Sequence, residues 1–278
     1  MPDMPAIPTA VAPAIAPAIA IVLAGQRRGA VNALAARAGV SHKCLVPIAG
    51  QPLIAHVLAT LAALPALAEI RISVEPDAEA GLRPVLAPFE ASGVPIRLVP
   101  SEARLADSLV TASGADAGPF LVTTADNVLI TPEAVAQIRA AIADGADAVA
   151  AMARKASVLA AHPEGQRNFY RFRDDEYANC NVYALANRKA IDAGAQVFRG
   201  GGQFMKSVWR MIAAFGLHNI VLLRLGVFSR EAAMRGLSRR LGLVVKAVEF
   251  TDGSLAVDVD NERTYRVCEE LLAKRAKA

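Results

Sequence analysis

The sequence predicts an α/β fold with a mostly parallel sheet, helices on both faces in a three-layer arrangement, and a helical insertion. Strand-like and helix-like segments alternate along the first half of the chain, as in sheets built with right-handed crossovers. The first strand-like segment, at 19–23, is apolar at every position, which is typical of a central strand covered on both faces. The chain has 278 residues, 54% of them apolar, which is enough for a full core.

The first half of the chain alternates strands and helices in this prediction. The strands are short apolar runs that end in polar or turn residues, at 19–23, 69–74, 95–99 and 119–124. The helices show apolar residues at helical spacing, at 52–64, 82–91, 108–113 and from 132 onwards. Pro84 and Pro88 weaken the second helix, whereas Thr131 and Pro132 suit the N-cap and first position of the fourth.

The rhythm changes after residue 148. Extended segments are expected at 149–152, 170–173, 180–185, 243–250 and 255–261. A helical insert covers about 193–241, and an amphipathic helix through Val267 and Leu271 closes the chain. We therefore expect a disordered lead-in over residues 1–18, rich in Pro and Ala, and one domain over 19–278.

Bulk properties exclude several classes of protein. Residues 4–26 are apolar enough to span a membrane, but four prolines there break any helix, so no transmembrane helix is expected. A net charge of +4 suits an anionic ligand, but spread-out basic residues and only 5% aromatic residues argue against nucleic acid. Three widely separated cysteines exclude a disulfide framework and favour a cytoplasmic location.

The loop after the first strand is the first candidate site. Leu23, Ala24, Gly25 and Gln26 are followed by Arg27, Arg28 and, further on, Lys43. Free backbone N–H groups in such a loop can hold phosphate oxygens while the cations neutralise their charge. The loop matches neither the Walker A nor the Rossmann dinucleotide motif, and an ordinary surface loop is the alternative.

Three aspartates form a candidate metal site. Asp126 ends the strand at 119–124, and Asp258 and Asp260 alternate with valines so that both carboxylates share one face. If the two segments meet, they offer the oxygen ligands that Mg²⁺ prefers. An ordinary turn aspartate and a solvent-facing edge strand are the alternatives.

A third set of polar residues suits an anionic acceptor, such as a phosphate monoester. Arg171 and Arg173 share a face if the segment is extended, with Arg167 before them and Asn181 after them. The alternative is a solvated face paired with the acidic residues at 174–176.

In this combination the chain resembles the MobA-like NTP transferases, the molybdenum-cofactor guanylyltransferase-like group with a GT-A type, Rossmann-like nucleotidyltransferase fold. The matching residues occur in the family's order and bracket most of the chain: Leu23-Ala24-Gly25, Arg28, the run from Lys43 to Leu53, Thr124-Ala125-Asp126, and the run from Val257 to Glu262. The run from Ala30 to Val40 and the insert depart from the minimal family pattern.

The resemblance implies that a phosphorylated small molecule or lipid head-group precursor attacks the α-phosphorus of a nucleoside triphosphate and releases pyrophosphate. Lys43, Arg28 and Asp126 would then be catalytic, with Mg²⁺ held by Asp126 and Asp258 and supported by Asp260. Ser108 corresponds to the family's nucleoside-contacting position. CTP is slightly favoured over GTP.

Two other functions stay open from the sequence. One is a GT-A glycosyltransferase that uses a nucleotide sugar. The other is a non-catalytic nucleotide-binding module at a membrane surface, because the insert interleaves apolar residues with basic ones: Lys206, Arg210, Arg224, Arg230, Arg235, Arg239 and Arg240. The insert would thus support peripheral contact with the inner membrane surface, a homodimer interface or a core helical pair.

Overall fold

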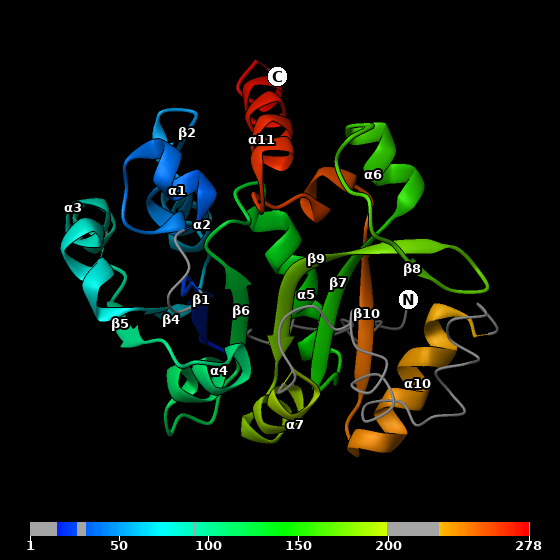
Figure 1. The fold of residues 1–278 in the computed structure, drawn as a ribbon. Helices are drawn as coiled ribbons and strands as arrows, with labels where there is room; N and C mark the ends of the chain where they lie inside the picture. The colour runs from blue at the N-terminus through cyan, green and yellow to red at the C-terminus, as the bar shows by residue number, and fades with distance from the viewer. Residues whose placement is uncertain (1–15, 27–31, 92, 199–227, 278) are drawn as a thin grey trace, which may run out of the picture.

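The computed structural model describes residues 16–26, 32–91, 93–198 and 228–277. For residues 197 and 198 it describes the backbone alone. Its main sheet has the strand order β10-β7-β9-β6-β1-β4-β5, with a short β8 beside β9 (Figure 1). The strands are β1 (Ala18–Leu23), β4 (Leu67–Val74), β5 (Ile96–Pro100), β6 (Phe120–Thr124), β7 (Ala148–Arg154), β8 (Tyr170–Arg171), β9 (Glu176–Leu185) and β10 (Val245–Phe250). A separate hairpin pairs β2 (Pro47–Ile48) with β3 (Gln51–Pro52).

The sheet is mostly parallel, as the sequence predicts. β1 lies inside the sheet and pairs in parallel with β4 on one side and β6 on the other. β9 runs antiparallel between β6 and β7, and β8 is antiparallel to β9. The carboxyl ends of β1, β4 and β6 therefore lie at one edge, where ligands bind in open α/β sheets.

Helices cover both faces of the sheet. They are α1 (Ala33–Ala38), α2 (Leu53–Ala62), α3 (Glu79–Glu90), α4 (Leu105–Ser113), α5 (Pro132–Ala143), α6 (Lys155–Ala161), α7 (Arg188–Phe198), α10 (Arg230–Leu241) and α11 (Glu262–Arg275), with 3-10 turns η1 (Lys43–Leu45), η2 (Pro76–Ala78) and η4 (Gly253–Ala256). Helix α5 starts as predicted, because the Thr131 hydroxyl accepts a hydrogen bond from the Ala134 amide at 3.2 Å.

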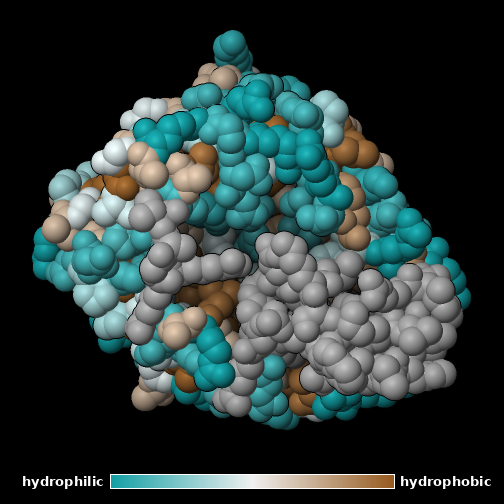
Figure 2. Space-filling view, in the orientation of Figure 1, coloured by the Kyte–Doolittle hydropathy of each residue, from teal (hydrophilic) through white to brown (hydrophobic). Residues whose placement is uncertain are grey.

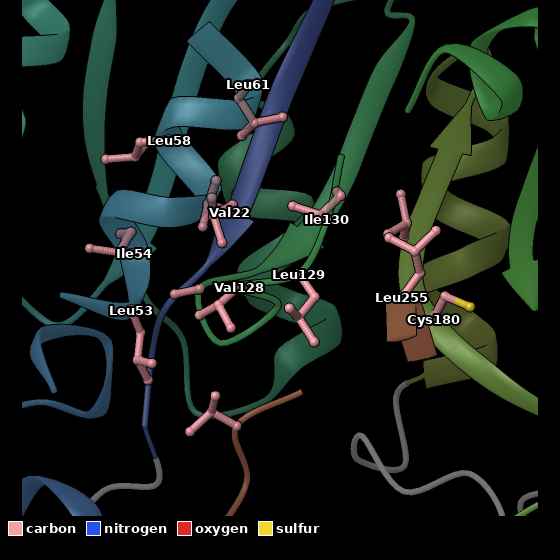
Figure 3. Packing of buried hydrophobic residues seen from close by; sticks show 14 of the residues in the cluster. Val22, Leu53, Ile54, Leu58, Leu61, Val128, Leu129, Ile130, Cys180 and Leu255 are labelled. Carbon is pink, nitrogen blue, oxygen red and sulfur yellow. The ribbon is translucent and has the colours of Figure 1, made fainter. Parts of the chain in front are cut away.

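The alternating side chains of β1 divide between two apolar clusters. Ala20 and Val22 pack in the larger cluster, with residues of α2, α3, α5 and α11. Figure 3 shows α2 side chains of this cluster close to Val22. Ile19 and Ile21 pack in a second cluster with residues of α4 and α7. This explains why β1 is apolar at every position, and it confirms the three-layer α/β fold.

Two local predictions about the chain were wrong. Pro84 and Pro88 do not interrupt α3, since Leu82 and Leu86 are buried in the core and tertiary packing stabilises the helix. Residues 255–261 do not form a strand; η4 covers the start and the rest pairs with no strand in the described part of the sheet. There the backbone of Gly253 packs so closely against Ser157 of α6 that a Cβ would lie 2.1 Å from the Ser157 carbonyl carbon.

The predicted helical insert is described at its two ends. Helix α7 starts at Arg188, five residues before the predicted boundary of 193, and α10 ends at Leu241 as predicted. Residues 199–227 of the insert and residues 1–15 of the predicted lead-in lie outside the described residues. Among the described helices, none combines the length and apolarity needed to cross a membrane.

Candidate active site

The candidate site lies at the carboxyl edge of the sheet, where four segments of the chain meet. Asp126 follows β6, and the loop Ala24–Gln26 follows the neighbouring strand β1. Lys43 comes from η1, and Asp258 and Asp260 come from the segment between η4 and α11. The Val259 amide donates to the Asp126 carbonyl oxygen at 3.1 Å, which fixes the aspartate segment beside the end of β6.

Lys43 lies between two of the three aspartates. Its Nζ donates a hydrogen bond to Asp126 Oδ2 and lies 3.3 Å from Asp260 Oδ1. One oxygen of each of Asp126, Asp258 and Asp260 lies within 4.8 Å of the others. Asp126 Oδ1 is buried and has no hydrogen-bond partner among the described residues. The cluster therefore offers a hard divalent cation three carboxylates, one of them with an uncommitted buried oxygen.

Charge and burial shift the titration of this cluster. Burial raises the pKa of the Asp258 carboxyl well above its usual range, and the charges of Asp126 and Asp260 raise it further. Burial acts to lower the pKa of Lys43, but the charges of Asp126 and Asp260 outweigh it, so the net pKa lies above its ordinary value. Lys43 is thus a permanent cation, and its charge partly offsets the repulsion among the carboxylates.

Asn181 holds the third carboxylate in place. Its Nδ2 donates to Asp258 Oδ2 at 2.8 Å, and its own Oδ1 accepts from Asn179 Nδ2 at 2.8 Å. Asn181 has a left-handed backbone with φ of 51° and lies where the register between β7 and β9 shifts. The irregular strand position therefore turns the Asn181 amide toward the aspartates.

The loop after β1 approaches the neighbouring strand ends closely. A Cβ on Gly25 would lie 2.9 Å from the Ser101 Cβ, so only glycine fits without movement. The backbone amide of Gln26 donates to Glu75 Oε1 at 2.9 Å, which anchors the loop to the end of β4. Two oxygens there, Gln26 Oε1 and Glu75 Oε2, are buried without a hydrogen-bond partner among the described residues, and Glu75 Oε2 lies 3.7 Å from His42 Nε2.

Two cavities meet at the aspartates. The first, which we name the loop cavity, has about 520 Å³ and is lined by Ala24, Gly25, Gln26, Asn32, Ala33, Lys43, Cys44 and Ala125. The second, the α4 cavity, has about 320 Å³ and is lined by Ala106, Leu109, Val122, Thr123, Asn181, Tyr183, Leu185, Gly194 and Asp258. Both are also lined by Leu23, Leu105, Thr124, Asp126 and Asp260, which form the boundary between them.

The structure brings together most, but not all, of the predicted site residues. Lys43, Asn181, the three aspartates and the loop residues from Leu23 to Gln26 line one or both cavities. Ser108 does not line them: its buried hydroxyl accepts from the Glu102 amide at 2.8 Å and shapes the turn before α4. Arg28 lies outside the described residues.

The three predicted acceptor-binding arginines do not line either cavity. Arg167, Arg171 and Arg173 are exposed on and around β8, and Arg171 lies 3.6 Å from Glu176. This placement agrees with the alternative of a solvated face paired with acidic residues. A role for them in acceptor binding stays a prediction without support from the described geometry.

Sequence reasoning missed several residues that line the cavities. Leu105 and Tyr183 lie on the regular elements α4 and β9, and nothing in their sequence spacing marks them as site residues. Asn32 lines the loop cavity and caps α1. Asn32 precedes an Ala-rich run in the sequence, and this pattern could have indicated a helix N-cap.

Comparison with known proteins gives the family. Residues 20–206 match the family model of the MobA-like NTP transferase domain, and the chain belongs to this family. The sequence matches none of the curated proteins with which it was compared.

Solved structures share the fold over nearly the whole chain. A hypothetical transferase from Thermus thermophilus is 27% identical, with a TM-score of 0.70 over 90% of this chain and 99% of that one. CMP:2-keto-3-deoxy-manno-octonic acid synthetase complexed with CTP is 15% identical, with a TM-score of 0.56 over 93% and 99%. 4-Diphosphocytidyl-2C-methyl-D-erythritol synthase from Anaerococcus prevotii is 10% identical, with a TM-score of 0.54 over 92% and 99%. The last two show the fold alone.

Proposed function

We propose that this MobA-like NTP transferase is a Mg²⁺-dependent nucleotidyltransferase that joins a nucleoside monophosphate to a phosphorylated acceptor and releases pyrophosphate. The observation that carries the proposal is the cluster of Lys43 with Asp126, Asp258 and Asp260 at the boundary of two cavities. One cavity contains the Lys43 cation, and the other is available to an acceptor. The reacting phosphates would then meet at the carboxylates.

The loop cavity is the proposed triphosphate site. Gly25 lines this cavity, and Lys43 supplies a positive charge within it. The backbone amides of Ala24 and Gln26, which the sequence predicts as phosphate donors, donate instead to the Ser73 carbonyl oxygen and to Glu75 Oε1. Arg28 remains part of the proposal as a second cation. CTP is proposed ahead of GTP, and two structural neighbours, a synthetase complexed with CTP and a 4-diphosphocytidyl-2C-methyl-D-erythritol synthase, support testing it first.

The aspartates fit Mg²⁺ by ligand type and by an unused oxygen. Carboxylate oxygens are the ligands that Mg²⁺ prefers, and Asp126 Oδ1 has no other partner among the described residues. When bound, Mg²⁺ would neutralise triphosphate charge and hold the phosphate oxygens in place. Asp126 and Asp258 would be its ligands, with Asp260 in support.

The protein's own residues act by positioning and by charge. Lys43 stays protonated and can stabilise negative charge that grows on the phosphates during transfer. Cys44 lines the loop cavity, but burial raises the pKa of its thiol to about 12, so it is not a thiolate nucleophile at neutral pH. The acceptor phosphate itself is therefore the proposed nucleophile, and no covalent enzyme intermediate is needed.

The direct test is pyrophosphate release. The purified protein is incubated with Mg²⁺, each of CTP, GTP, ATP and UTP, and a panel of phosphate monoesters. We expect release with one triphosphate and a loss of about 100-fold or more in kcat/KM for Asp126→Ala, by analogy with the loss of a single charge-stabilising group. Asp144→Ala, at an exposed aspartate after α5, is the matched control and should keep full activity.

Two results would contradict the proposal. Activity that survives Asp126→Ala would show that the carboxylate cluster takes no part in the reaction. Hydrolysis or transfer from a nucleotide sugar, without pyrophosphate release from any triphosphate, would instead support a glycosyltransferase.

Location and assembly also stay proposals. We propose a cytoplasmic protein, with the basic and apolar insert as its contact with a membrane surface or a second copy. In the described part of the insert, Arg230 pairs with Glu249 at 2.7 Å and Arg235 with Glu231 at 2.7 Å. Flotation with vesicles that contain anionic lipid, compared with neutral vesicles, would decide between the two contacts.

A further inference from the structure

We propose that the acceptor is a phosphate monoester of a hydrocarbon alcohol, a lipid-type monophosphate, whose chain occupies the α4 cavity. This inference rests on the proposed transfer reaction and specifies its acceptor. Three observations carry it: the chemistry of the cavity lining, the state of the polar groups in that lining, and the position of the cavity beside the carboxylates.

The lining is mainly apolar. Six aliphatic side chains from β1, β6, β9 and α4 contribute to it: Leu23, Leu105, Ala106, Leu109, Val122 and Leu185. Among the residues that the structure describes, no lysine or arginine lines this cavity. In Figure 2, hydrophobic surface is visible in a hollow above α4. A ligand that fills such a cavity gains from burying hydrocarbon.

Most polar groups of the lining are already committed. The Tyr183 hydroxyl accepts from Asn179 Nδ2 at 2.5 Å, and the Asn181 amide donates to Asp258. Thr123 Oγ1 accepts from Asn127 Nδ2 at 3.3 Å. Thr124 Oγ1 has no partner among the described residues, but it lies on the boundary of the two cavities. A sugar in the α4 cavity would therefore leave several hydroxyl groups unpaired.

The position of the cavity fixes the direction of the ligand. Asp126 and Asp260 lie at the boundary with the loop cavity, and Asp258 lines the α4 cavity within reach of them, so the charged end of the acceptor belongs at this end of the cavity. The apolar residues of α4 and β9 lie on the other side of that boundary. A volume of about 320 Å³ is roughly ten times the ~30 Å³ of one water in the liquid, which gives room for about ten methylene-sized groups.

The reaction balances without a further reactant. An oxygen of the ionised acceptor phosphate forms a bond to the α-phosphorus of the triphosphate. The bond from that phosphorus to the oxygen bridging to the β-phosphorus breaks, and the electron pair leaves with pyrophosphate. The product is a nucleoside diphosphate whose terminal phosphate carries the hydrocarbon.

A homologous series of acceptors tests the inference. Butyl, hexyl and octyl phosphate are compared with glycerol 3-phosphate and glucose 1-phosphate, with Mg²⁺ and each triphosphate, by pyrophosphate release and mass spectrometry of the product. We expect kcat/KM to rise up to about four-fold per added methylene, from the value for burying one such group, until the cavity is full. The two hydrophilic phosphates should be at least about 50-fold poorer than octyl phosphate, the gain of three buried methylenes.

Gly194 provides a variant that blocks the cavity. It lies in α7 and lines the α4 cavity, and no described residue lies within 4 Å of a Cβ placed on it. Gly194→Phe should remove the preference for long chains and leave the KM for the triphosphate unchanged, because Gly194 does not line the loop cavity. Gly236→Phe is the matched control, since Gly236 is a glycine of α10 with equally open surroundings and lines neither cavity.

The outcomes separate this inference from the proposed function. Turnover of hydrophilic phosphates with no gain along the alkyl series would overturn the inference and leave the transferase reaction intact. No turnover with any acceptor would overturn the proposed reaction. Binding then decides the inference: octyl phosphate with Mg²⁺ should raise the Tm of the wild-type protein but not that of Gly194→Phe, and an equal effect on both would overturn it.

Discussion

Replacing Asn181 should weaken metal binding without removing a metal ligand. In the structure the Asn181 amide donates to Asp258 Oδ2 at 2.8 Å, so it holds the carboxylate of a proposed ligand. A hydrogen bond to a charged group contributes about 1.5–3 kcal/mol. Since 1.4 kcal/mol corresponds to a factor of ten, Asn181→Ala should lower Mg²⁺ affinity by about 10- to 100-fold, the usual range for residues that orient a metal ligand.

Because Asn181 has a left-handed backbone, a second variant is needed to separate the loss of its hydrogen bond from backbone strain. Its φ of 51° lies in the left-handed region, which alanine occupies at a cost of about 1–2 kcal/mol and glycine without penalty. Asn181→Gly removes the amide but keeps that conformation accessible. We therefore expect both variants to lose Mg²⁺ affinity alike, whereas Asn181→Ala should lose more thermal stability.

Calorimetric titration with Mg²⁺, together with thermal unfolding in its absence, measures the two effects separately. If both variants bound Mg²⁺ within about two-fold of the wild type, the amide would not orient Asp258 and the reasoning would be refuted. If only Asn181→Ala lost affinity, the backbone conformation and not the hydrogen bond would be the cause.

Two further substitutions probe the segments that support the site. Gly25→Ala should lower the free energy of unfolding by about 1–3 kcal/mol, the usual cost of overpacking, because its Cβ would lie 2.9 Å from the Ser101 Cβ; an unchanged urea midpoint would contradict the close approach. Asp252→Ala removes the N-cap of η4 and should lower stability at pH 7 by about 1 kcal/mol. Burial acts to raise the pKa of Asp252, but hydrogen bonds from Ser254 and the charge of Arg275 outweigh it and hold it below the ordinary 3.8. The stability that ionised Asp252 contributes is therefore complete above pH 3.8 and is lost as the pH falls through the lowered pKa. The difference in free energy of unfolding between Asp252→Ala and the wild type should thus shrink in acid and stay constant near neutrality.

The parallel core could be predicted from the sequence because its signals are local. Each inner strand is a short apolar run, and β1 shows why, since both of its faces are buried. The end of β6 could be recognised because Asp126 follows such a run directly. Because carboxyl ends of parallel strands share one edge of a sheet, the sequence predicts that Asp126 and the loop after β1 lie at the same edge; their direct neighbourhood follows from the long-range pairing of β1 with β6.

Contacts between distant segments could not be predicted in the same way. The antiparallel insertion of β9 between β6 and β7 depends on long-range pairing, and it determines where Asn181 lies. Arg171 lies 3.6 Å from Glu176, within a stretch of the sequence that carries both basic and acidic residues. The pattern of charges alone therefore could not distinguish an ion-paired surface from an anion-binding site. Ser108 shows the same limit, because a buried serine that closes a turn has the same sequence context as one that contacts a ligand.

The segment from Val257 to Asp260 brings the two predicted carboxylates close to Asp126 without forming the predicted strand. The alternation of valine and aspartate predicts two carboxylates on one face, and a strand is one backbone that produces it. In the structure the segment pairs with no strand in the described part of the sheet, and the Asp260 backbone amide donates to the Asp258 carbonyl oxygen at 3.1 Å across a tight turn. Val257 and Val259 are buried, and the Val259 backbone amide donates to the Asp126 carbonyl oxygen. Burial of the valines therefore directs both carboxylates toward Lys43. The alternating pattern reports which side chains are buried, and the metal-binding geometry depends on that burial rather than on membership of a sheet.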